Sequence, residues 1–441
     1  MKRYEKYKPT GIQWLPEIPE HWNIESFGKH FSFGKGLPIT KADLTKEGIA
    51  VISYGQVHSK LNLGVTLSDS LIRYVSNRWL DTNPQNLLRK CDFVFADTSE
   101  DIAGAGNCAF NDYSKPLFAG YHIVIARPTE VENSRYWAYL FQSNCWKSQV
   151  QSLVNGVKVY SINKSILKKS AILIPHISEQ YKIVAYLNKR ITLIKSCKCQ
   201  RERELQTLNE LKQAEIASVV TRGLNPDVPM KDSGIPWIGM IPEHWNVKSL
   251  RAYLRLVSEK NHPKATLLSV TREQGVIVRD VESKEENHNF IPEDLSGYKY
   301  VHKGQFVINK MKAWQGSYGV SLYDGIVSPA YYVCDLDFPD KEYFSLAIRS
   351  KTYVDFFACW SKGIRVGQWD LEPIALKSVP FLEPPVKEMH EIVDYVKDKT
   401  KKIDTMIEAL TAEINRLTEY KQRLISDVVT GQIDVRGEQI Q

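Results

Sequence analysis

Two short turns that contain glycine carry the residues best suited to bind a polyanion. The first is Asn155-Gly-Val-Lys158 and the second is Lys362-Gly-Ile-Arg365. Each leads into polar or aromatic residues, which are Tyr160, Ser161, Asn163 and Lys164 after the first turn and Gln368 and Trp369 after the second. Lysine and arginine bind phosphate oxygens, and arginine, asparagine and glutamine can pair with base edges in the DNA major groove. The turns are therefore the first candidates for DNA contact, and the alternative is that Lys158 and Arg365 are solvated turn residues.

A second set of candidate contacts follows the first predicted strand in each half of the chain. It comprises Ser53, Tyr54, Gln56 and His58 in the first half and Ser269, Thr271, Arg272 and Gln274 in the second. Lys310, Lys312 and Trp314 form a further basic and aromatic group that could hold the DNA backbone or a groove edge. The alternative for this group is that Trp314 belongs to the hydrophobic core.

The sequence shows few signs of catalytic chemistry. Gly104-Ala-Gly-Asn-Cys-Ala109 fits the spacing of a dinucleotide-binding loop, but turn-forming residues stand where the pyrophosphate-binding helix should begin. A glycine-rich hairpin loop is the better interpretation. The chain has neither an adenine-methyltransferase motif of the NPPY type nor a P-loop, and Cys197 and Cys199 would face apart on a predicted helix. We therefore expect no catalytic residue, no metal and no cofactor on this chain.

Length and composition are typical of a globular protein with several domains. The chain has 441 residues, of which 43% are hydrophobic and 25% are charged, so two or three domains are expected. The net charge of +7 permits an anionic partner without requiring one. The sequence has no apolar segment long enough to span a membrane and no signal peptide, so we expect a cytoplasmic protein without a membrane partner.

An internal duplication is evident from the residues Ile-Pro-Glu-His-Trp-Asn, which occur at positions 18–23 and again at 241–246. The flanks agree at the same offset, since Trp14 corresponds to Trp237. The histidine of each copy is expected to be structural and to close the turn of the repeat. A second pair of similar segments begins at residues 175 and 383, and each runs into a long charged stretch that ends near Val-Val-Thr.

Two long helices are predicted over residues 175–223 and 384–432. In the second, apolar residues recur at alternating steps of three and four from Val393 to Val428, which is the pattern of a coiled-coil seam. The first helix has the same register, but polar residues such as Lys198 and Arg201 interrupt its seam. We expect the helices to pack on each other and expect Lys198 and Arg201 to pair with Glu408 or Glu413. The alternative is that each helix packs only on its own domain.

Between each repeated motif and its helix lies a strand-rich region, at residues 28–174 and 251–383. Runs of β-branched and aromatic residues broken by turn formers predict strands at residues 49–54, 92–97, 122–128, 305–310 and 330–336. The two regions differ almost completely in sequence, yet Lys90-Cys-Asp-Phe-Val-Phe95 parallels Lys303-Gly-Gln-Phe-Val-Ile308. We expect one fold to carry two different surfaces.

The expected domain organisation follows the order of these segments. The first motif and strand-rich domain occupy residues 1–174, the first helix 175–223, the linker with the second motif and domain 224–383, the second helix 384–432 and a tail 433–441.

This arrangement resembles the specificity subunit of type I restriction-modification systems. The resemblance covers the whole chain and rests on the duplicated IPEHW motif, the segments that begin at residues 175 and 383, and the helices that end near Val-Val-Thr. It implies an α+β fold in which two long antiparallel coiled-coil helices separate two strand-rich α/β target recognition domains, related by a pseudo-two-fold internal repeat.

The resemblance also implies the partners. They would be double-stranded DNA, two modification subunits that methylate adenine from S-adenosylmethionine, and restriction subunits that join through them and use ATP to translocate and cut DNA. The chain itself would perform no chemistry, because S-adenosylmethionine, ATP and Mg²⁺ would be bound by the partner subunits only.

The dissimilarity of the two strand-rich regions predicts a bipartite and asymmetric DNA target. Two readers of one face of B-DNA lie about one helical turn, roughly 34 Å, apart, and a stiff helix pair could set that spacing. Two other functions stay open. An enzyme with an unrecognised active site would show turnover alone, and a coiled-coil adaptor would show no salt-dependent DNA affinity.

Overall fold

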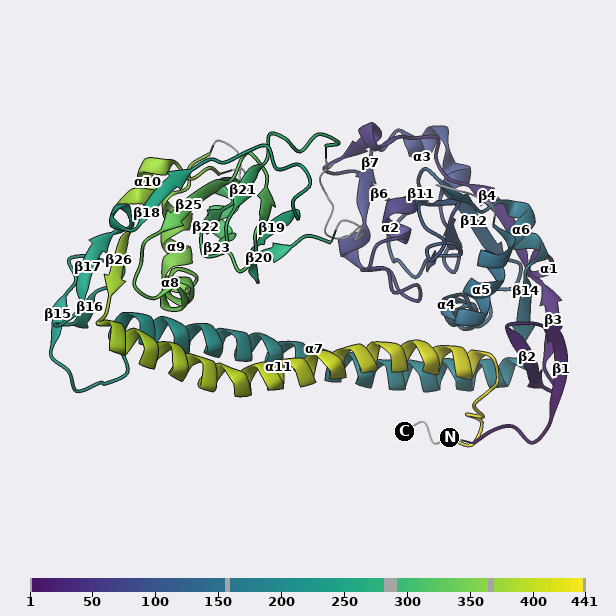
Figure 1. Ribbon diagram of the computed structural model, residues 1–441. Coiled ribbons are helices and arrows are strands. Elements are labelled where there is room, and N and C mark those ends of the chain that lie inside the picture. The colour runs from purple at the N-terminus through teal and green to yellow at the C-terminus, as the bar shows by residue number, and fades with distance from the viewer. Residues whose placement is uncertain (1, 155–158, 281–291, 364–368, 439–441) are drawn as a thin grey trace. The chain divides into compact units, whose positions relative to one another are not determined.

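Two compact units make up the computed structural model of the chain, which describes residues 2–154, 159–280, 292–363 and 369–438 (Figure 1). Unit 1 contains residues 1–201 and 412–441, and unit 2 contains residues 202–411. Both unit borders fall inside long helices, α7 (Ile177–Arg222) and α11 (Val386–Val429), so each unit receives part of both. The domain borders expected from the sequence follow the order of the chain, and they stay a prediction.

Two four-stranded sheets form the body of unit 1. The first is antiparallel with the order β10-β8-β12-β4 and consists of β4 (Phe31–Lys35), β8 (Phe93–Ala96), β10 (Cys108–Phe110) and β12 (Ile123–Pro128). The second has the order β11-β6-β7-β5 and consists of β5 (Leu44–Thr45), β6 (Ile49–Ile52), β7 (Arg73–Val75) and β11 (Leu117–Ala119). Three short pairs are β1 (Tyr7–Ile12) with β2 (Leu15–Pro19), β3 (Asn23–Ser26) with β14 (Ala171–Ile174), and β9 (Thr98–Ser99) with β13 (Tyr160–Ser161).

Helices cover the first sheet of unit 1, and aromatic side chains fill the space between them. The short helices are α1 (Phe27–His30), α2 (Tyr54–Val57), α3 (Trp79–Thr82), α4 (Ser134–Gln142), α5 (Asn144–Leu153) and α6 (Lys164–Lys169), with 3-10 turns η1 (Lys41–Asp43), η2 (Asp69–Leu71) and η3 (Pro84–Asn86). The ring of Phe141 on α4 lies 4.6 Å from that of Trp146 on α5 and 5.5 Å from that of Phe95 on β8. Such buried aromatic groups supply much of the apolar area of a core.

Unit 2 has a matching body. Its antiparallel sheet has the order β18-β25-β22-β23 and consists of β18 (Leu254–Val257), β22 (Phe306–Ile308), β23 (Tyr318–Val320) and β25 (Tyr332–Leu336). Four further pairs are β15 (Met230–Asp232) with β16 (Met240–Pro242), β17 (Asn246–Ser249) with β26 (Pro380–Glu383), β19 (Leu268–Thr271) with β20 (Gly275–Val278), and β21 (Lys299–Val301) with β24 (Gly325–Val327). Its helices are α8 (Lys341–Ile348), α9 (Lys351–Trp360) and α10 (Pro373–Ser378), with 3-10 turns η4 (Leu250–Ala252) and η5 (Lys310–Gln315).

The two bodies share one topology, as the sequence predicts. The strand order β4-β12-β8-β10 in unit 1 corresponds to β18-β25-β22-β23 in unit 2. Phe93 and Phe306, which are equivalent in the two landmark segments, are the first residues of β8 and β22. The predicted strands are confirmed as β6, β8, β12, β22 and β25.

The glycine-rich segment of unit 1 is a turn, as expected. Gly106 has a φ of +86°, and strand β10 follows where a dinucleotide-binding loop would need a helix. Because β10 pairs antiparallel with β8, the segment connects two strands of one sheet.

The long helices run antiparallel within each unit, and the predicted packing is confirmed. In unit 1, Lys198 Nζ donates to Thr418 Oγ1 over 3.2 Å, and Arg201 Nε bonds Glu413 Oε1 over 3.1 Å. The latter is one of the pairs expected from the sequence. In unit 2, Tyr395 Oη donates to Glu215 Oε1 over 2.6 Å. Polar contacts thus supplement the apolar seam at the positions where the first helix lacks apolar residues.

The repeated IPEHW motif fastens each body to the first turn of a long helix. His21 Nε2 lies 2.8 Å from Glu179 Oε2 on α7, and His244 Nε2 lies 2.7 Å from Glu388 Oε2 on α11. The adjacent indole of Trp245 donates to the same Glu388 oxygen over 3.0 Å. A carboxylate in the first turn also interacts favourably with the helix dipole. The two histidines therefore have the structural role that the sequence predicts.

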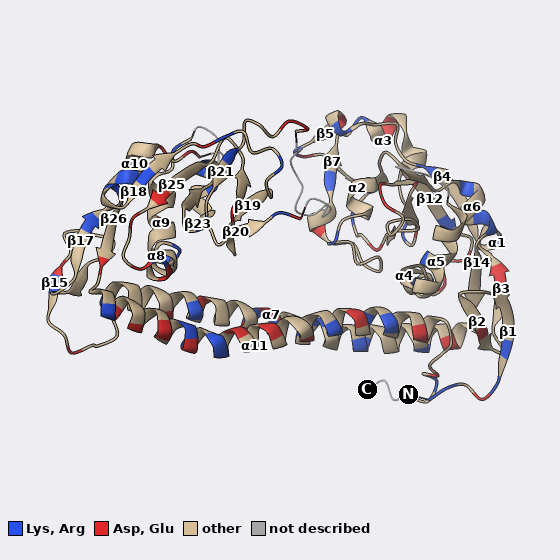
Figure 2. Cartoon of the chain, viewed as in Figure 1, with Lys and Arg blue, Asp and Glu red and all other residues tan. Residues whose placement is uncertain are grey.

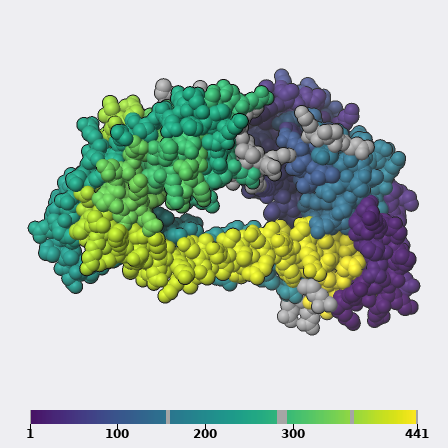
Figure 3. Space-filling model, in the orientation of Figure 1, coloured from purple at the N-terminus to yellow at the C-terminus, as the bar shows by residue number. Residues whose placement is uncertain are grey.

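Each long helix ends against the motif of the other repeat. Gly431, which follows α11, has a φ of +74°, and a Cβ there would lie 2.4 Å from a carbon of Pro19 and 3.3 Å from the ring of Trp22. Gly223, which follows α7, makes the equivalent approach to Trp245 in unit 2. Figure 3 shows the end of α11, in yellow, packed on the purple N-terminal segment of unit 1. Each unit is therefore one repeat body completed by the last turns of the other repeat's helix.

Candidate nucleic-acid interface

Strand β9 brings together two groups of predicted DNA contacts in unit 1 that lie about a hundred residues apart in the sequence. His58, just after α2, places Nε2 2.8 Å from the carbonyl oxygen of Thr98. On the other side, Tyr160 pairs with Ser99 and Ser161 pairs with Thr98 in the β9–β13 ladder. The Ser53–His58 segment and the Tyr160 segment are thus neighbours, although neither spacing nor periodicity relates them.

Part of this set also serves local structure. Ser53 is buried and precedes α2, and its backbone N–H donates to Gln56 Oε1 over 3.1 Å. Asn163 caps α6, because its Oδ1 accepts from the N–H of Ile166 over 2.9 Å. Tyr160 and Lys164 are partly exposed. Apart from the buried Ser53, the described residues of this set keep exposed surface, most of all Ser161 and Asn163.

Two aromatic residues, Tyr121 and His122, extend this surface beside the predicted Tyr54, and the sequence reasoning missed both. The ring of Tyr54 lies 5.6 Å from that of Tyr121 and 5.5 Å from that of His122. His122 is exposed, and its Nδ1 lies 3.1 Å from Asp97 Oδ1. The only sequence signal was a Tyr-His pair directly before a predicted strand, and its proximity to Tyr54 depends on the sheet.

In unit 2, η5 holds the predicted Lys310, Lys312 and Trp314. Lys310 Nζ lies 2.8 Å from Asp370 Oδ2, and this hydrogen bond raises the pKa of Lys310 above its ordinary value. The rings of Trp314 and Trp369 are 4.9 Å apart. Lys312 is exposed, whereas Trp314 is partly buried. The structure thus joins η5 to the Trp369–Asp370 segment, and Asp370 is a further polar residue that sequence reasoning missed.

Two more lysines enlarge the basic group around Lys310. Burial lowers the pKa of Lys299 on β21, and the nearby charges of Lys260 and Lys310 lower it further. Lys299 Nζ donates to the carbonyl oxygen of Tyr331 over 2.6 Å. Figure 2 shows the basic residue of β21 and mixed charges along α7 and α11. The like charges around Lys299 favour an anion such as a phosphate group, so Lys260 and Lys299, beside the Asp370-paired Lys310, form a candidate backbone contact.

Arg272 is placed differently from the other predicted residues of unit 2. It lies exposed in the β19–β20 turn, and its carbonyl oxygen accepts from Arg349 Nη2 over 3.1 Å. Glu273 Oε1 lies 3.6 Å from its Nε. The structure therefore groups Arg272 with Arg349 after α8 rather than with the Lys310 group.

Three predicted contacts cannot be placed. Lys158, Arg365 and Gln368 lie outside the described residues, as do the whole of the first glycine-containing turn and the second half of the other. In the described part of the chain no group of three or more His, Cys, Asp or Glu side chains could hold a metal ion. Among those same residues, no helix combines the length and the apolar character needed to cross a bilayer.

Comparison with known proteins relates the chain to one family. Residues 20–207 match the family model described as the type I restriction modification DNA specificity domain. The chain is 22% identical to a protein assigned as the type I restriction enzyme MjaX specificity subunit of Methanocaldococcus jannaschii, over 98% of this chain and 97% of that protein. It is 23% identical to the type I restriction enzyme EcoKI specificity subunit of Escherichia coli, over 79% of this chain and 78% of that protein.

A solved structure has a similar fold. Its description is "Structural basis underlying complex assembly and conformational transition of the type I R-M system", and it superposes with a TM-score of 0.63 over 94% of this chain and 99% of that chain. The identity is 14%, so the likeness establishes the fold alone.

Proposed function

We propose that this chain, a member of the family of type I restriction-modification specificity subunits, reads a bipartite DNA target with one half-site for each strand-rich domain. The observation that carries the proposal is one sheet topology presented twice with different polar residues. Unit 1 offers Gln56, Tyr160, Asn163 and Lys164, whereas unit 2 offers Lys299, Lys310 and Lys312. Readers that share a fold but differ in their surface residues should prefer different bases, so the target is asymmetric.

The division of chemistry between the residues follows from their types. Lys164, Lys310 and Lys312 would neutralise phosphates, and Gln56, Asn163 and Ser53 would meet base edges or orient their neighbours. Tyr160 and Arg272 would contact a groove edge. Lys158, Arg365 and Gln368 stay in this proposal as the base-reading candidates of the two glycine-containing turns.

The remaining activities would belong to partners. The chain would bind two modification subunits and, through them, the restriction subunits, and it would perform no catalysis. S-adenosylmethionine, ATP and Mg²⁺ would be held by those subunits. The motif clamps at Glu179 and Glu388 support this view, because they give both bodies the same attachment to the helices and so the same frame for a partner. Such a complex would act in the cytoplasm, where bacterial DNA lies.

The experiment that tests the proposal is co-expression with a candidate modification subunit, followed by mapping of methylated adenines across the host genome. Methylation at a single asymmetric sequence split by a fixed gap is the expected result. A complex that assembles but adds no methylation would refute the proposal. The purified chain, incubated with labelled S-adenosylmethionine or with Mg²⁺ and DNA, should show no turnover, and turnover would favour the enzyme alternative.

A further inference from the structure

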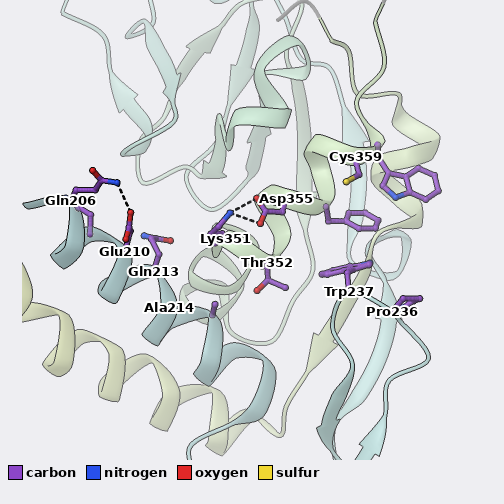
Figure 4. Close-up of a pocket in the computed structure, with 14 residues that line it drawn as sticks. Gln206, Glu210, Gln213, Ala214, Pro236, Trp237, Lys351, Thr352, Asp355 and Cys359 are labelled. Atoms are coloured by element: carbon purple, nitrogen blue, oxygen red, sulfur yellow. Dashed lines mark hydrogen bonds and ion pairs between the residues drawn. The ribbon is translucent and has the colours of Figure 1, made fainter. Parts of the chain in front are cut away.

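A groove of about 970 Å³ opens in unit 2 between α7, α9 and the loop that carries Trp237 (Figure 4). We call it the α7–α9 groove. Figure 4 shows Gln213 of α7 and Lys351 of α9 on opposite sides of it. All of its lining residues belong to unit 2, so the groove is a property of that unit alone.

The corresponding place in unit 1 is bridged by hydrogen bonds. The counterparts of Trp237 and Phe356 are Trp14 and Gln149, and the small cavity of about 10 Å³ that these two residues line has no wall from α11. Helix α11 approaches α5 closely there, because Gln422 Nε2 donates to Asn144 Oδ1 over 3.2 Å and the N–H of Asn144 donates to Ser426 Oγ over 2.9 Å.

A change of residue type accounts for part of this difference. At the helix offset of 209 residues, Ser426 of α11 corresponds to Ala217 of α7, which has no hydroxyl to accept the same bond. Gln213, the counterpart of Gln422, lines the groove instead. The hydrogen bonds that draw helix and body together in unit 1 are therefore replaced in unit 2 by open space.

The α9 side of the groove is aromatic. The ring of Trp237 lies 4.6 Å from that of Phe356, which lies 5.6 Å from that of Trp360. Trp360 is 45% exposed, and its counterpart in unit 1 is Leu153, which is 43% exposed. Exposed tryptophan beside a pocket is the kind of residue that dominates the binding energy of protein interfaces.

The charges of the groove favour a basic occupant. Lys351 Nζ is bonded to Asp355 Oδ2 over 2.7 Å, so those two charges offset each other. Glu210 accepts a neutral hydrogen bond from Gln206 Nε2 over 2.8 Å, which leaves its negative charge as the surplus among the described residues that line the groove. A nucleic acid phosphate would be repelled here, whereas a lysine or arginine of a protein would be attracted.

The shape of the groove fits a helix. Its α7 wall presents Gln206, Glu210, Gln213 and Ala217, and its α9 wall presents Thr352, Phe356 and Trp360, which are both rows of residues three or four apart. Such rows form ridges on a helix surface, and the ridges of a further helix can pack into the grooves between them. The α7 row covers 12 residues, or roughly 16 Å at 1.5 Å per residue, which is the length of about three helical turns.

We propose that the α7–α9 groove docks one amphipathic helix of a protein partner, with an apolar face on Trp237, Phe356 and Trp360 and a lysine or arginine beside Glu210. In unit 1, hydrogen bonds from Asn144 to Ser426 and from Gln422 to Asn144 join α5 and α11 at the corresponding place, so the partner helix binds once per chain. This inference stands independently of DNA reading, because it rests on the groove and not on the basic surface of either body.

Photocrosslinking of the intact complex tests the docking. The crosslinking amino acid p-benzoylphenylalanine is introduced by the substitution of Cys359, at the groove, or of its unit 1 counterpart Ser152, and both positions are exposed. In cells that contain the native partners, position 359 should crosslink to a single protein segment that is helical, has an apolar face and carries a basic residue. Position 152 should give no such product.

A matched pair of variants then tests the contact itself. The crosslinked segment is synthesised as a peptide, and its Kd is measured with the wild-type chain, Trp360→Glu and Leu153→Glu. We expect Trp360→Glu to weaken binding by roughly tenfold or more and Leu153→Glu to leave it unchanged. No protein crosslink at position 359, a crosslink to DNA or to a second copy of the chain, or equal binding by all three proteins would overturn the proposal. Genome methylation by the same complexes reports DNA reading separately.

Discussion

The helix pair has different electrostatics in the two units. In unit 2, Lys212 Nζ of α7 lies 2.5 Å from Asp404 Oδ1 of α11. At the offset of 209 residues, the counterparts in unit 1 are Lys421 and Lys195. Burial lowers the pKa of Lys421, and the like charges of Lys195 and Lys198 lower it further. One position in the seam is therefore neutralised in unit 2 and surrounded by like charge in unit 1.

This comparison separates what the duplication has kept from what it has changed. Both units keep the sheet order, the buried motif tryptophans Trp22 and Trp245, and the histidine–glutamate clamps. They differ in the seam charges, in the α7–α9 groove and in the polar residues offered to DNA. The motif clamps that join each body to the first turn of a long helix are common to both units, whereas the hydrogen bonds between α11 and α5 are specific to unit 1 and the surface residues have diverged.

The largest expected effect concerns the clamp tryptophans. Trp22→Ala and Trp245→Ala should each lower the free energy of unfolding by about 3–5 kcal/mol, because each removes a fully buried indole. Phenylalanine substitutions sharpen the comparison. The Trp245 indole donates to Glu388, whereas Trp22 Nε1 is buried without a partner, so Trp245→Phe should cost about 1 kcal/mol more than Trp22→Phe. Urea denaturation followed by circular dichroism measures both, and equal costs would show that the hydrogen bond contributes nothing.

The next effect concerns the basic group of unit 2. Lys299→Ala should weaken DNA binding and reduce the slope of log Kd against log salt concentration by about one, as expected for one lost phosphate contact. Lys397→Ala is the control, because Lys397 Nζ is paired with Glu342 over 2.6 Å on the same unit. Titrations of fluorescent DNA at several salt concentrations give the slopes. An unchanged slope for Lys299→Ala would remove this residue from the proposed interface.

A smaller effect tests the seam charges directly. Lys195→Asp gives Lys421 the carboxylate partner that Lys212 has in unit 2, so it should raise the free energy of unfolding by about 0.5–1 kcal/mol. The reverse change, Asp404→Lys, should destabilise unit 2 by a similar amount or more. Thermal unfolding at low and high salt measures the difference, which should shrink with added salt. Destabilisation by Lys195→Asp would mean that the two seams are not equivalent in geometry.

The smallest effect is a pH dependence of opposite sign in the two sheets. Hydrogen bonds from Arg255 and Gln305 lower the pKa of Asp335 in unit 2. The ionised Asp335 therefore stabilises the folded chain above the unfolded pKa, which is near 4, and this stabilisation is lost as the pH falls through the lower pKa of the folded state. Burial raises the pKa of Asp92 in unit 1 despite its bond to Arg127, so its contribution is favourable below pH 4 and is lost as the pH rises through the folded value.

Asparagine substitutions make this contrast measurable. Asp335→Asn should destabilise the chain at pH 6 and lose that effect by pH 3, whereas the cost of Asp92→Asn should not diminish on acidification. Urea midpoints between pH 3 and pH 7 report both trends. The same trend for both variants would contradict the opposite pKa shifts.

Much of the fold could be predicted from the sequence because its signals are local. Runs of β-branched and aromatic residues bounded by turn formers predicted β8, β12 and β22, and the heptad pattern predicted both long helices. The seam register also limited the partners of Arg201 to Glu408 or Glu413, and the structure has the second of these pairs. The fold class and the family resemblance rest on these local patterns and their repetition.

The missed features depend on contacts between distant segments. Nothing near Asp370 in the sequence indicates Lys310, and nothing near Tyr121 indicates Tyr54. In the order of the sequence, each long helix is the last element of its own repeat. In the structure, the close approach of Gly223 to Trp245 and of Gly431 to Trp22 places the end of each helix against the motif of the other repeat. The α7–α9 groove lies where unit 1 has hydrogen bonds between α11 and α5. A local sequence pattern does not indicate that unit 2 lacks the equivalent contact.

The crossing of the helices between units has a consequence for the order in which the protein folds during synthesis. Unit 2 consists of one continuous stretch, residues 202–411, and all of it is translated before residues 412–441. Unit 1 needs residues 412–441 to cover the motif at Trp22, although its body is translated first. The N-terminal body therefore keeps part of its apolar surface uncovered until residues 412–441 have been synthesised. The half that is made second is the half that can be completed first.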